Sequence, residues 1–256
     1  TDLTTTTTTA ETAITSQPIA FPAPIEPTVR TINYSEEVRS NLSKDVADIW
    51  TFEGEAGSLV TIEAWADNPL SGTSKIPFVE QYTDGVLDLA LILLAPDGTT
   101  IERINDFISL EEEISSNPKI VAARLPMDGT YEIRVKSYLN ITAGAYSLKL
   151  EQISPFVTGE ELEKYVGNYV DGPWQIPVEQ YIENGLLYIH FVSLGQEFEL
   201  IPIEPDIFVT SGESNGFTRF KFDEEGNVNG YEILMPLYHL NNGGRWIEGV
   251  AVESFD

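Results

Sequence analysis

Most of this chain after residue 31 consists of short alternating or apolar runs that end at turn-forming residues. Residues 131–135 (Tyr-Glu-Ile-Arg-Val) alternate cleanly, and Leu87 to Ala95 is almost wholly apolar before the turn Pro96-Asp97-Gly98. In such a turn proline presets φ and glycine accepts a positive φ. Many short strands separated by turns are typical of a sandwich or a barrel, so the sequence predicts an all-β protein.

The same pattern divides the chain into two β domains in tandem behind an N-terminal extension. We predict the extension over residues 1–31, a jelly-roll β-sandwich over residues 32–153, and a small antiparallel β-barrel or sandwich over residues 154–256. Glu160 to Tyr165 are expected to form one or two helical turns with Thr158 as the N-cap. A chain of 256 residues is long enough for two cores of ordinary size.

The N-terminal extension combines a threonine-rich strand with a proline-rich spacer. Residues 4–9 are six consecutive threonines, whose β-branched side chains favour extended backbone. The prolines at positions 18, 22, 24 and 27 then keep the chain extended and out of a central strand. A strand of this kind is suited to adding itself to the sheet edge of another subunit. The residues assigned to this assembly strand are Thr4, Thr5, Thr6, Thr7, Thr8, Thr9, Ala10, Thr12 and Ile14.

The charge and the hydropathy pattern exclude several classes of partner. The chain carries 41 acidic and 14 basic side chains, for a net charge of −27. This surface repels nucleic acid and anionic lipid, so we exclude nucleic acid as a partner. No apolar run approaches the length of about 18 residues that spans a bilayer, so no membrane insertion is expected. Cysteine is absent, which excludes disulfides and thiolate chemistry.

The start of the chain and its sequons bear on localisation. The sequence begins Thr1-Asp2 with neither an initiator methionine nor a signal peptide, which predicts a mature product exported to the extracellular space or the cell surface. Asn-x-Ser/Thr triplets make Asn33, Asn41 and Asn140 candidate glycosylation sites.

No pattern in the sequence indicates catalysis. The only histidines are His190, in a strand pattern, and His239, near a loop, and neither lies in a recognisable catalytic motif. We therefore predict no enzyme and no catalytic residue. Zinc is not expected without cysteine or H-E-x-x-H spacing. Acidic turns such as Asp223-Glu224-Glu225 leave calcium open, but none matches a twelve-residue calcium loop, so the prediction is no cofactor and no metal ligand.

The four tryptophans are candidates for stacking on a glycan. Trp50 and Trp65 fall within strand patterns and are expected in the core. Trp174 and Trp246 follow glycine-containing segments, which makes them candidate glycan or interface aromatics.

Several motifs in the first domain occur in the order found in the bacterial pre-peptidase C-terminal domain, which residues 36–151 resemble. These motifs are Asp48–Phe52, Gly57–Ile62, Leu87–Leu89, Leu93–Gly98, Leu125–Tyr131 and Gly144–Leu148. The resemblance implies a compact β-sandwich that usually accompanies secreted enzymes, with a binding or maturation role rather than catalysis. Residues 68–83 form a longer insertion than the family usually carries.

Residues 158–240 are similar to another family, the small β-barrel domain of unknown function that follows the catalytic domain of beta-lactamase-like serine hydrolases. The motifs are Leu162–Tyr169, Gly185–Tyr188, Phe198–Pro202, Phe217–Phe220 and Gly226–Gly230. The hydrolase domain that normally precedes this barrel is not found in the chain, so the resemblance implies no catalytic residue here.

Two functions remain as hypotheses. The first is a non-catalytic extracellular structural protein, the subunit of a surface filament or pilus-like homopolymer whose copies join head-to-tail by donating the N-terminal strand. The second is an accessory or carbohydrate-binding module of a secreted enzyme system, with a glycan as its partner and the N-terminal extension as a linker.

Overall fold

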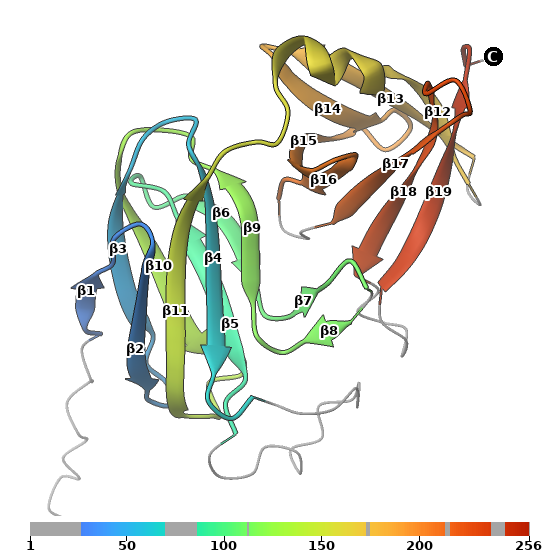
Figure 1. The fold of residues 1–256 in the computed structure, drawn as a ribbon. Coiled ribbons are helices and arrows are strands. Elements are labelled where there is room, and N and C mark those ends of the chain that lie inside the picture. Colours follow the sequence, from blue (N-terminus) through green and yellow to red (C-terminus); the bar gives the residue numbers. More distant parts are fainter. Residues whose placement is uncertain are drawn as a thin grey trace, which may run out of the picture.

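The computed structural model describes residues 27–69, 86–111, 113–172, 175–212, 216–236 and 244–255. Over these residues the protein is all-β, as the sequence predicted. Figure 1 shows a β-sandwich followed by a separate barrel of strands. No helix in the described part has the length and apolarity needed to cross a bilayer.

The sandwich consists of a five-stranded and a four-stranded sheet. The first sheet holds β1 (Val29–Thr31), β3 (Asp48–Gly54), β10 (Gly129–Ser137), β5 (Leu89–Leu94) and β6 (Thr100–Ile104), in that spatial order. The second holds β2 (Glu36–Leu42), β11 (Gly144–Ile153), β4 (Leu59–Ala66) and β9 (Lys119–Arg124). Strand β1 falls within the predicted N-terminal extension, yet it joins the first sheet by running parallel to β3.

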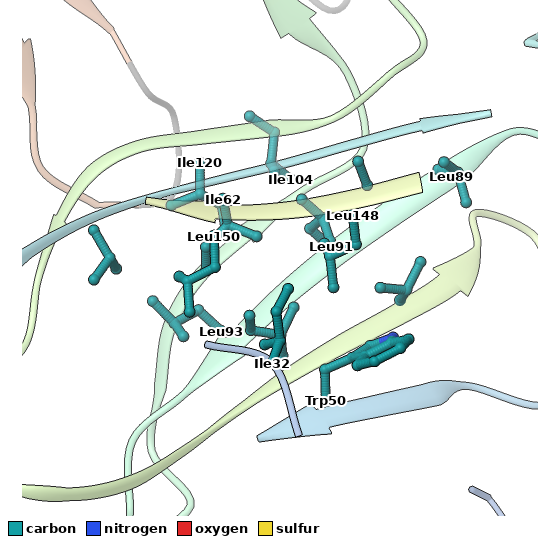
Figure 2. Packing of buried hydrophobic residues seen from close by; sticks show 14 of the residues in the cluster. Ile32, Trp50, Ile62, Leu89, Leu91, Leu93, Ile104, Ile120, Leu148 and Leu150 are labelled. Atoms are coloured by element: carbon teal, nitrogen blue, oxygen red, sulfur yellow. The ribbon is translucent and has the colours of Figure 1, made fainter. Parts of the chain in front are cut away.

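The core of the sandwich lies between the two sheets, as Figure 2 shows. Leu91 and Leu93 of β5 face Leu148 and Leu150 of β11, and all four are fully buried. Every residue of β5 is buried, which confirms the prediction of a strand covered on both faces. Trp50 is buried as expected, whereas Trp65 is only half-buried.

The barrel is a closed antiparallel meander of eight strands. Consecutive strands pair with each other, and the last pairs back with the first. The strands are β12 (Gly167–Asp171), β13 (Ile176–Glu183), β14 (Leu186–Phe191), β15 (Gln196–Glu204), β16 (Ile207–Thr210), β17 (Phe217–Phe222), β18 (Val228–Pro236) and β19 (Gly244–Val252).

A 3₁₀ helix, η2 (Gly159–Tyr165), covers one end of the barrel (Figure 1). Thr158 is the N-cap residue, as predicted, but its side chain makes no capping hydrogen bond. The helix instead buries Leu162 and Tyr165 in the barrel core, so tertiary packing replaces the cap as the stabilising contact.

The two domains pack directly against each other. A hairpin of the sandwich domain, β7 (Phe107–Ile108) with β8 (Ile114–Ser115), reaches the end of the barrel opposite η2 (Figure 1). There Ile108 packs with three buried residues of the outer barrel wall, namely Val209, Phe217 and Leu234. The Phe107 and Phe217 rings meet edge-to-face at 6.2 Å.

Polar contacts reinforce this interface. Arg124 of β9 donates from Nε to both carboxylate oxygens of Glu199 on β15, each at 2.9 Å. The backbone N–H of Gly212 donates to Glu102 Oε1 at 2.9 Å. The interface thus combines apolar burial with a bidentate ion pair, which fixes the geometry of the pair more tightly than a single contact would.

Candidate functional site inside the C-terminal barrel

Several of the predicted functional residues lie outside the part of the chain that the structure describes. These are the assembly strand, residues 4–14, together with Trp174, His239 and the side chain of Trp246. The predictions on them therefore stay predictions.

The described candidates do not form a catalytic or metal site. His190 lies half-buried on β14 with Nδ1 4.0 Å from a carboxylate oxygen of Glu179, an arrangement on the outer wall of the barrel. Among the described residues, no group of three or more His, Asp or Glu side chains is placed to hold a metal ion. The three sequon asparagines, Asn33, Asn41 and Asn140, are all exposed.

One cleft of about 480 Å³ lies at an end of the sandwich, lined by Tyr34, Glu53, Gly54, Glu55, Ser58, Asp128, Gly129 and Gln152. Two of its carboxylates are already engaged. Asp128 accepts a hydrogen bond from the Ala56 backbone N–H at 2.7 Å, and Glu53 accepts one from the Thr130 hydroxyl at 2.7 Å. The first bond joins two chain segments that are distant in sequence, and the second joins cross-strand partners on β3 and β10, so both carboxylates serve the structure of the sandwich end.

Most of the buried polar atoms without a hydrogen-bonding partner among the described residues lie in the barrel interior. Five side chains carry them there, namely Asp171, Gln180, Thr210, Thr218 and Tyr231, and the Tyr34 hydroxyl at the sandwich cleft is the other case. Gln180 is the extreme case, because it is 1% exposed and neither its amide oxygen nor its amide nitrogen is bonded. Buried polar groups in proteins nearly always have a partner, and each exception requires an explanation.

The alternation of the strands accounts for these positions. On β12, Tyr169 and Asp171 are both buried while the intervening residue is not, so the two side chains share the inner face. Val178 and Gln180 have the same relation on β13. The polar groups are therefore built into the inner wall by the same periodicity that places the apolar core.

Asp171 and Tyr231 lie on either side of Gly249. Both residues are cross-strand partners of this glycine, Asp171 from β12 and Tyr231 from β18. A side chain at Gly249 would put its Cβ 2.3 Å from Tyr231 Cζ, so only glycine lets the ring lie across β19. The Tyr231 and Tyr169 rings meet edge-to-face at 5.2 Å.

The electrostatics agree with a dry and acidic interior. Burial raises the pKa of the Asp171 carboxyl, against a smaller opposing effect of the Gly172 N–H. Burial also raises the pKa of Tyr231, and the negative charge of Asp171 raises it further. Burial raises the pKa of Tyr169 to about 12. Each shift disfavours the charged form of the group in this interior.

Beside η2, in contrast, the buried tyrosine hydroxyls have partners. The Tyr165 ring packs edge-to-face on Phe208 and at a tilt on Phe220, at centroid distances of 4.7 and 4.5 Å. Its hydroxyl donates to Asp206 Oδ1 at 2.8 Å, and the Tyr169 hydroxyl donates to the Tyr165 carbonyl at 3.1 Å. The unpartnered groups are thus a property of particular inner-wall positions and not of the whole barrel.

Sequence comparison does not place the chain in a known family. No family model matches it, and no curated protein gives a match.

Among solved structures, the chain is similar to the pre-peptidase C-terminal domain of a collagenase from Bacillus anthracis, with 14% identity, a TM-score of 0.31, and coverage of 50% of this chain and 99% of that one. It is also similar to PliG, a periplasmic inhibitor of g-type lysozyme. The PliG of Aeromonas hydrophila gives 15% identity, a TM-score of 0.32 and coverage of 50% and 100%. The PliG of Salmonella Typhimurium gives 15%, 0.29, and 49% and 98%. A pre-peptidase C-terminal domain is therefore among the structural neighbours, as the sequence resemblance predicted.

Proposed function

We propose that this chain is a non-catalytic extracellular binding protein whose C-terminal barrel holds one small polar ligand. The observation that carries the proposal is the set of unpartnered polar atoms on the inner wall of the closed barrel. This is a specific form of the accessory-module hypothesis, in which the ligand binds in the barrel interior and not at Trp174 and Trp246.

The energetic argument is that unpartnered groups are costly to keep. Each buried donor or acceptor without a partner destabilises a fold by about 1–3 kcal/mol. Several such groups in one small barrel are hard to explain by packing, since apolar residues of similar shape would fill the same positions. A ligand that bonds to them recovers the cost. An eight-stranded barrel has an interior of the size that holds one small ligand or is filled by side chains.

A screen by thermal unfolding and NMR tests this function. The ¹⁵N-labelled full chain is titrated with small ammonium compounds, neutral amides and polyols, and carboxylates. We expect one class to raise the unfolding midpoint and to shift amide signals of β12, β13 and β18. The matched controls are Gln180→Leu, on the inner wall, which should weaken binding, and Glu179→Gln, its exposed neighbour, which should not. If no class shifts the midpoint or these signals, the function is overturned.

Strand donation is a second candidate, favoured by the position of β1. The residues that follow the predicted spacer already form an added strand, since β1 pairs in parallel with β3 at the edge of the first sheet. Arg30 of β1 fixes this strand by donating to Ser40 Oγ at 2.7 Å and to Asp48 Oδ2 at 3.1 Å. The assembly strand, residues 4–14, would be presented from this edge.

Deleting residues 1–14 tests strand donation. We expect the full chain to form head-to-tail polymers in electron micrographs and the deletion to leave folded monomers. A variant with serine in place of Thr4 to Thr9 keeps the length but lowers the β-propensity, so it should polymerise less. A full chain that stays monomeric at high concentration, or a deletion that polymerises unchanged, contradicts the hypothesis.

A further inference from the structure

We propose that the ligand of the barrel is a small organic ammonium compound whose charged nitrogen sits between Asp171 and Tyr231. This inference rests on the proposed binding function and names the ligand class for the same site. Four features of the inner wall support it.

The first feature is a buried carboxylate. Asp171 is 6% exposed, and its Oδ1 has no hydrogen-bonding partner. A buried charge is tolerated in proteins when an opposite charge and further hydrogen bonds compensate it. Asp171 therefore creates a demand for a cationic hydrogen-bond donor at this position of the barrel.

The second feature is that the described basic side chains of this domain point elsewhere. Lys164 pairs with Asp206 at 3.2 Å beside η2. Lys221 pairs with Glu232 and Glu248, each at 2.8 Å, on the outer wall. Arg219 also pairs with Glu232, at 3.9 Å. None of these described ion pairs involves Asp171, so we assign its cation to a ligand.

The third feature is the relation between Asp171 and Tyr231. They approach Gly249 from its two sides, and Tyr231 carries the influence of the Asp171 charge, yet both Asp171 Oδ1 and the Tyr231 hydroxyl lack a hydrogen bond. Since neither group has a partner, one donor that reached both would satisfy both. A protonated primary or secondary amine has at least two N–H bonds and can donate to both.

The fourth feature is the aromatic surface beside the carboxylate. Tyr169 and Tyr231 present their rings at 67° to each other, next to the position of Asp171 on β12. Aromatic faces attract organic cations, and the attraction is strongest where water is excluded. The net charge of −27 favours the approach of cations to the protein as a whole.

Together these features distinguish between kinds of ammonium. A quaternary ammonium has no N–H to give to Asp171 and Tyr231, so the wall favours an amine that keeps its hydrogens. The aromatic pair favours an apolar group of modest size attached to the nitrogen.

Isothermal titration calorimetry at neutral pH tests the inference with three probes of similar size. Benzylamine is the cationic donor, benzyl alcohol its neutral counterpart, and benzyltrimethylammonium a cation without N–H bonds. We expect benzylamine to bind at least about tenfold more tightly than either of the others, the ratio expected for one charge-assisted hydrogen bond.

Variants assign the site. Asp171→Asn should weaken benzylamine binding by about tenfold or more, and Tyr231→Phe by a smaller factor. Glu248→Gln is the matched control, because Glu248 lies beside Gly249 but is exposed on the outer wall. Circular dichroism shows whether each variant is folded, and the Asn substitution keeps the shape of the side chain.

The outcomes separate this inference from the proposed function. Equal binding of benzyl alcohol and benzylamine, or benzylamine binding that Asp171→Asn leaves unchanged, overturns the ammonium assignment and leaves a binding barrel. Binding of carboxylates in place of amines does the same. If no compound of any class binds, the function and the ligand class are both overturned.

Discussion

The sandwich and the barrel each bury an aspartate beside tyrosine side chains, and they treat it in opposite ways. In the sandwich, Asp48 Oδ2 accepts hydrogen bonds from Arg30 at 3.1 Å, from the Ser40 hydroxyl at 2.8 Å and from the Tyr146 hydroxyl at 2.8 Å. Tyr146 in turn accepts from Trp50 Nε1 at 2.9 Å. In the barrel, Asp171 Oδ1 has no such partner.

The difference separates a structural carboxylate from one that is available. The Asp48 network links β1, β2, β3 and β11, and each of its residues stabilises the fold through a hydrogen bond. Asp171 Oδ1 joins no such network, so its burial needs another reason. Substitution of matched residues in the two networks should therefore change stability in opposite directions.

The largest effect is expected from Asp48→Ala. This change leaves the Tyr146 hydroxyl and the Arg30 guanidinium without their acceptor, so the free energy of unfolding should fall by about 3 kcal/mol. Urea unfolding followed by tryptophan fluorescence measures it. Asp67→Ala is the control, since its ion pair with Arg39 is exposed and should matter by less than about 0.5 kcal/mol. Equal effects of the two changes would contradict the claim that the buried Asp48 network stabilises the sandwich.

The next effect is expected from Tyr146→Phe. The ring stays in place while the bonds to Asp48 and Trp50 are lost, so the free energy of unfolding should fall by about 1.5 kcal/mol. The same urea titration gives the value. A double variant with Asp48→Ala should cost less than the sum of the single changes, because the two residues share one network. Simple additivity would contradict that network.

The barrel counterpart, Tyr231→Phe, should act in the opposite direction. It removes a buried hydroxyl that has no partner, so the ligand-free protein should gain stability, by up to about 1 kcal/mol. Differential scanning calorimetry in the absence of any amine measures the change. A loss of stability as large as that of Tyr146→Phe would show that the hydroxyl has a partner in solution.

The smallest expected effect is the pH dependence that Asp171 gives to the free energy of unfolding. Burial raises the folded-state pKa of Asp171 above the ordinary value of 3.8, so the protonated form contributes stability that is complete below about that pH. This contribution is lost as the pH rises through the folded pKa. Compared with Asp171→Asn, the ligand-free wild type should therefore become progressively less stable from about pH 4 upward, as measured by unfolding at a series of pH values. A difference that does not vary with pH would mean that Asp171 stays solvated.

Much of the fold follows from the sequence. Alternation and turn residues predicted the all-β class, and the apolar run from Leu87 to Ala95 predicted a strand buried on both faces, which is β5. Thr158 occupies the N-cap position that the sequence predicted, but without the side-chain hydrogen bond, because a local pattern shows only that a cap is allowed. The burial of Leu162 and Tyr165 depends on strands far along the chain, and local patterns do not contain it.

The candidate site could not be predicted from the sequence, for a related reason. Asp171 and Gln180 look like ordinary polar residues of amphipathic strands, and nothing local tells which face points inward. The inner face is decided by the closure of β12 on β19, a pairing between opposite ends of the domain. The alternation of Tyr169 with Asp171 was a usable signal only once the barrel was known to close.

The contact between the domains gives the barrel two unequal sides. The described sandwich contacts fall on β15 to β18, through Glu199, Val209, Phe217 and Leu234, and so brace one half of the circumference. Asp171 lies on β12, in the other half. Transient opening of the barrel wall should therefore occur mainly where β12 pairs with β13 and β19. Small molecules would then enter between these strands, while the half that contacts the sandwich stays rigid.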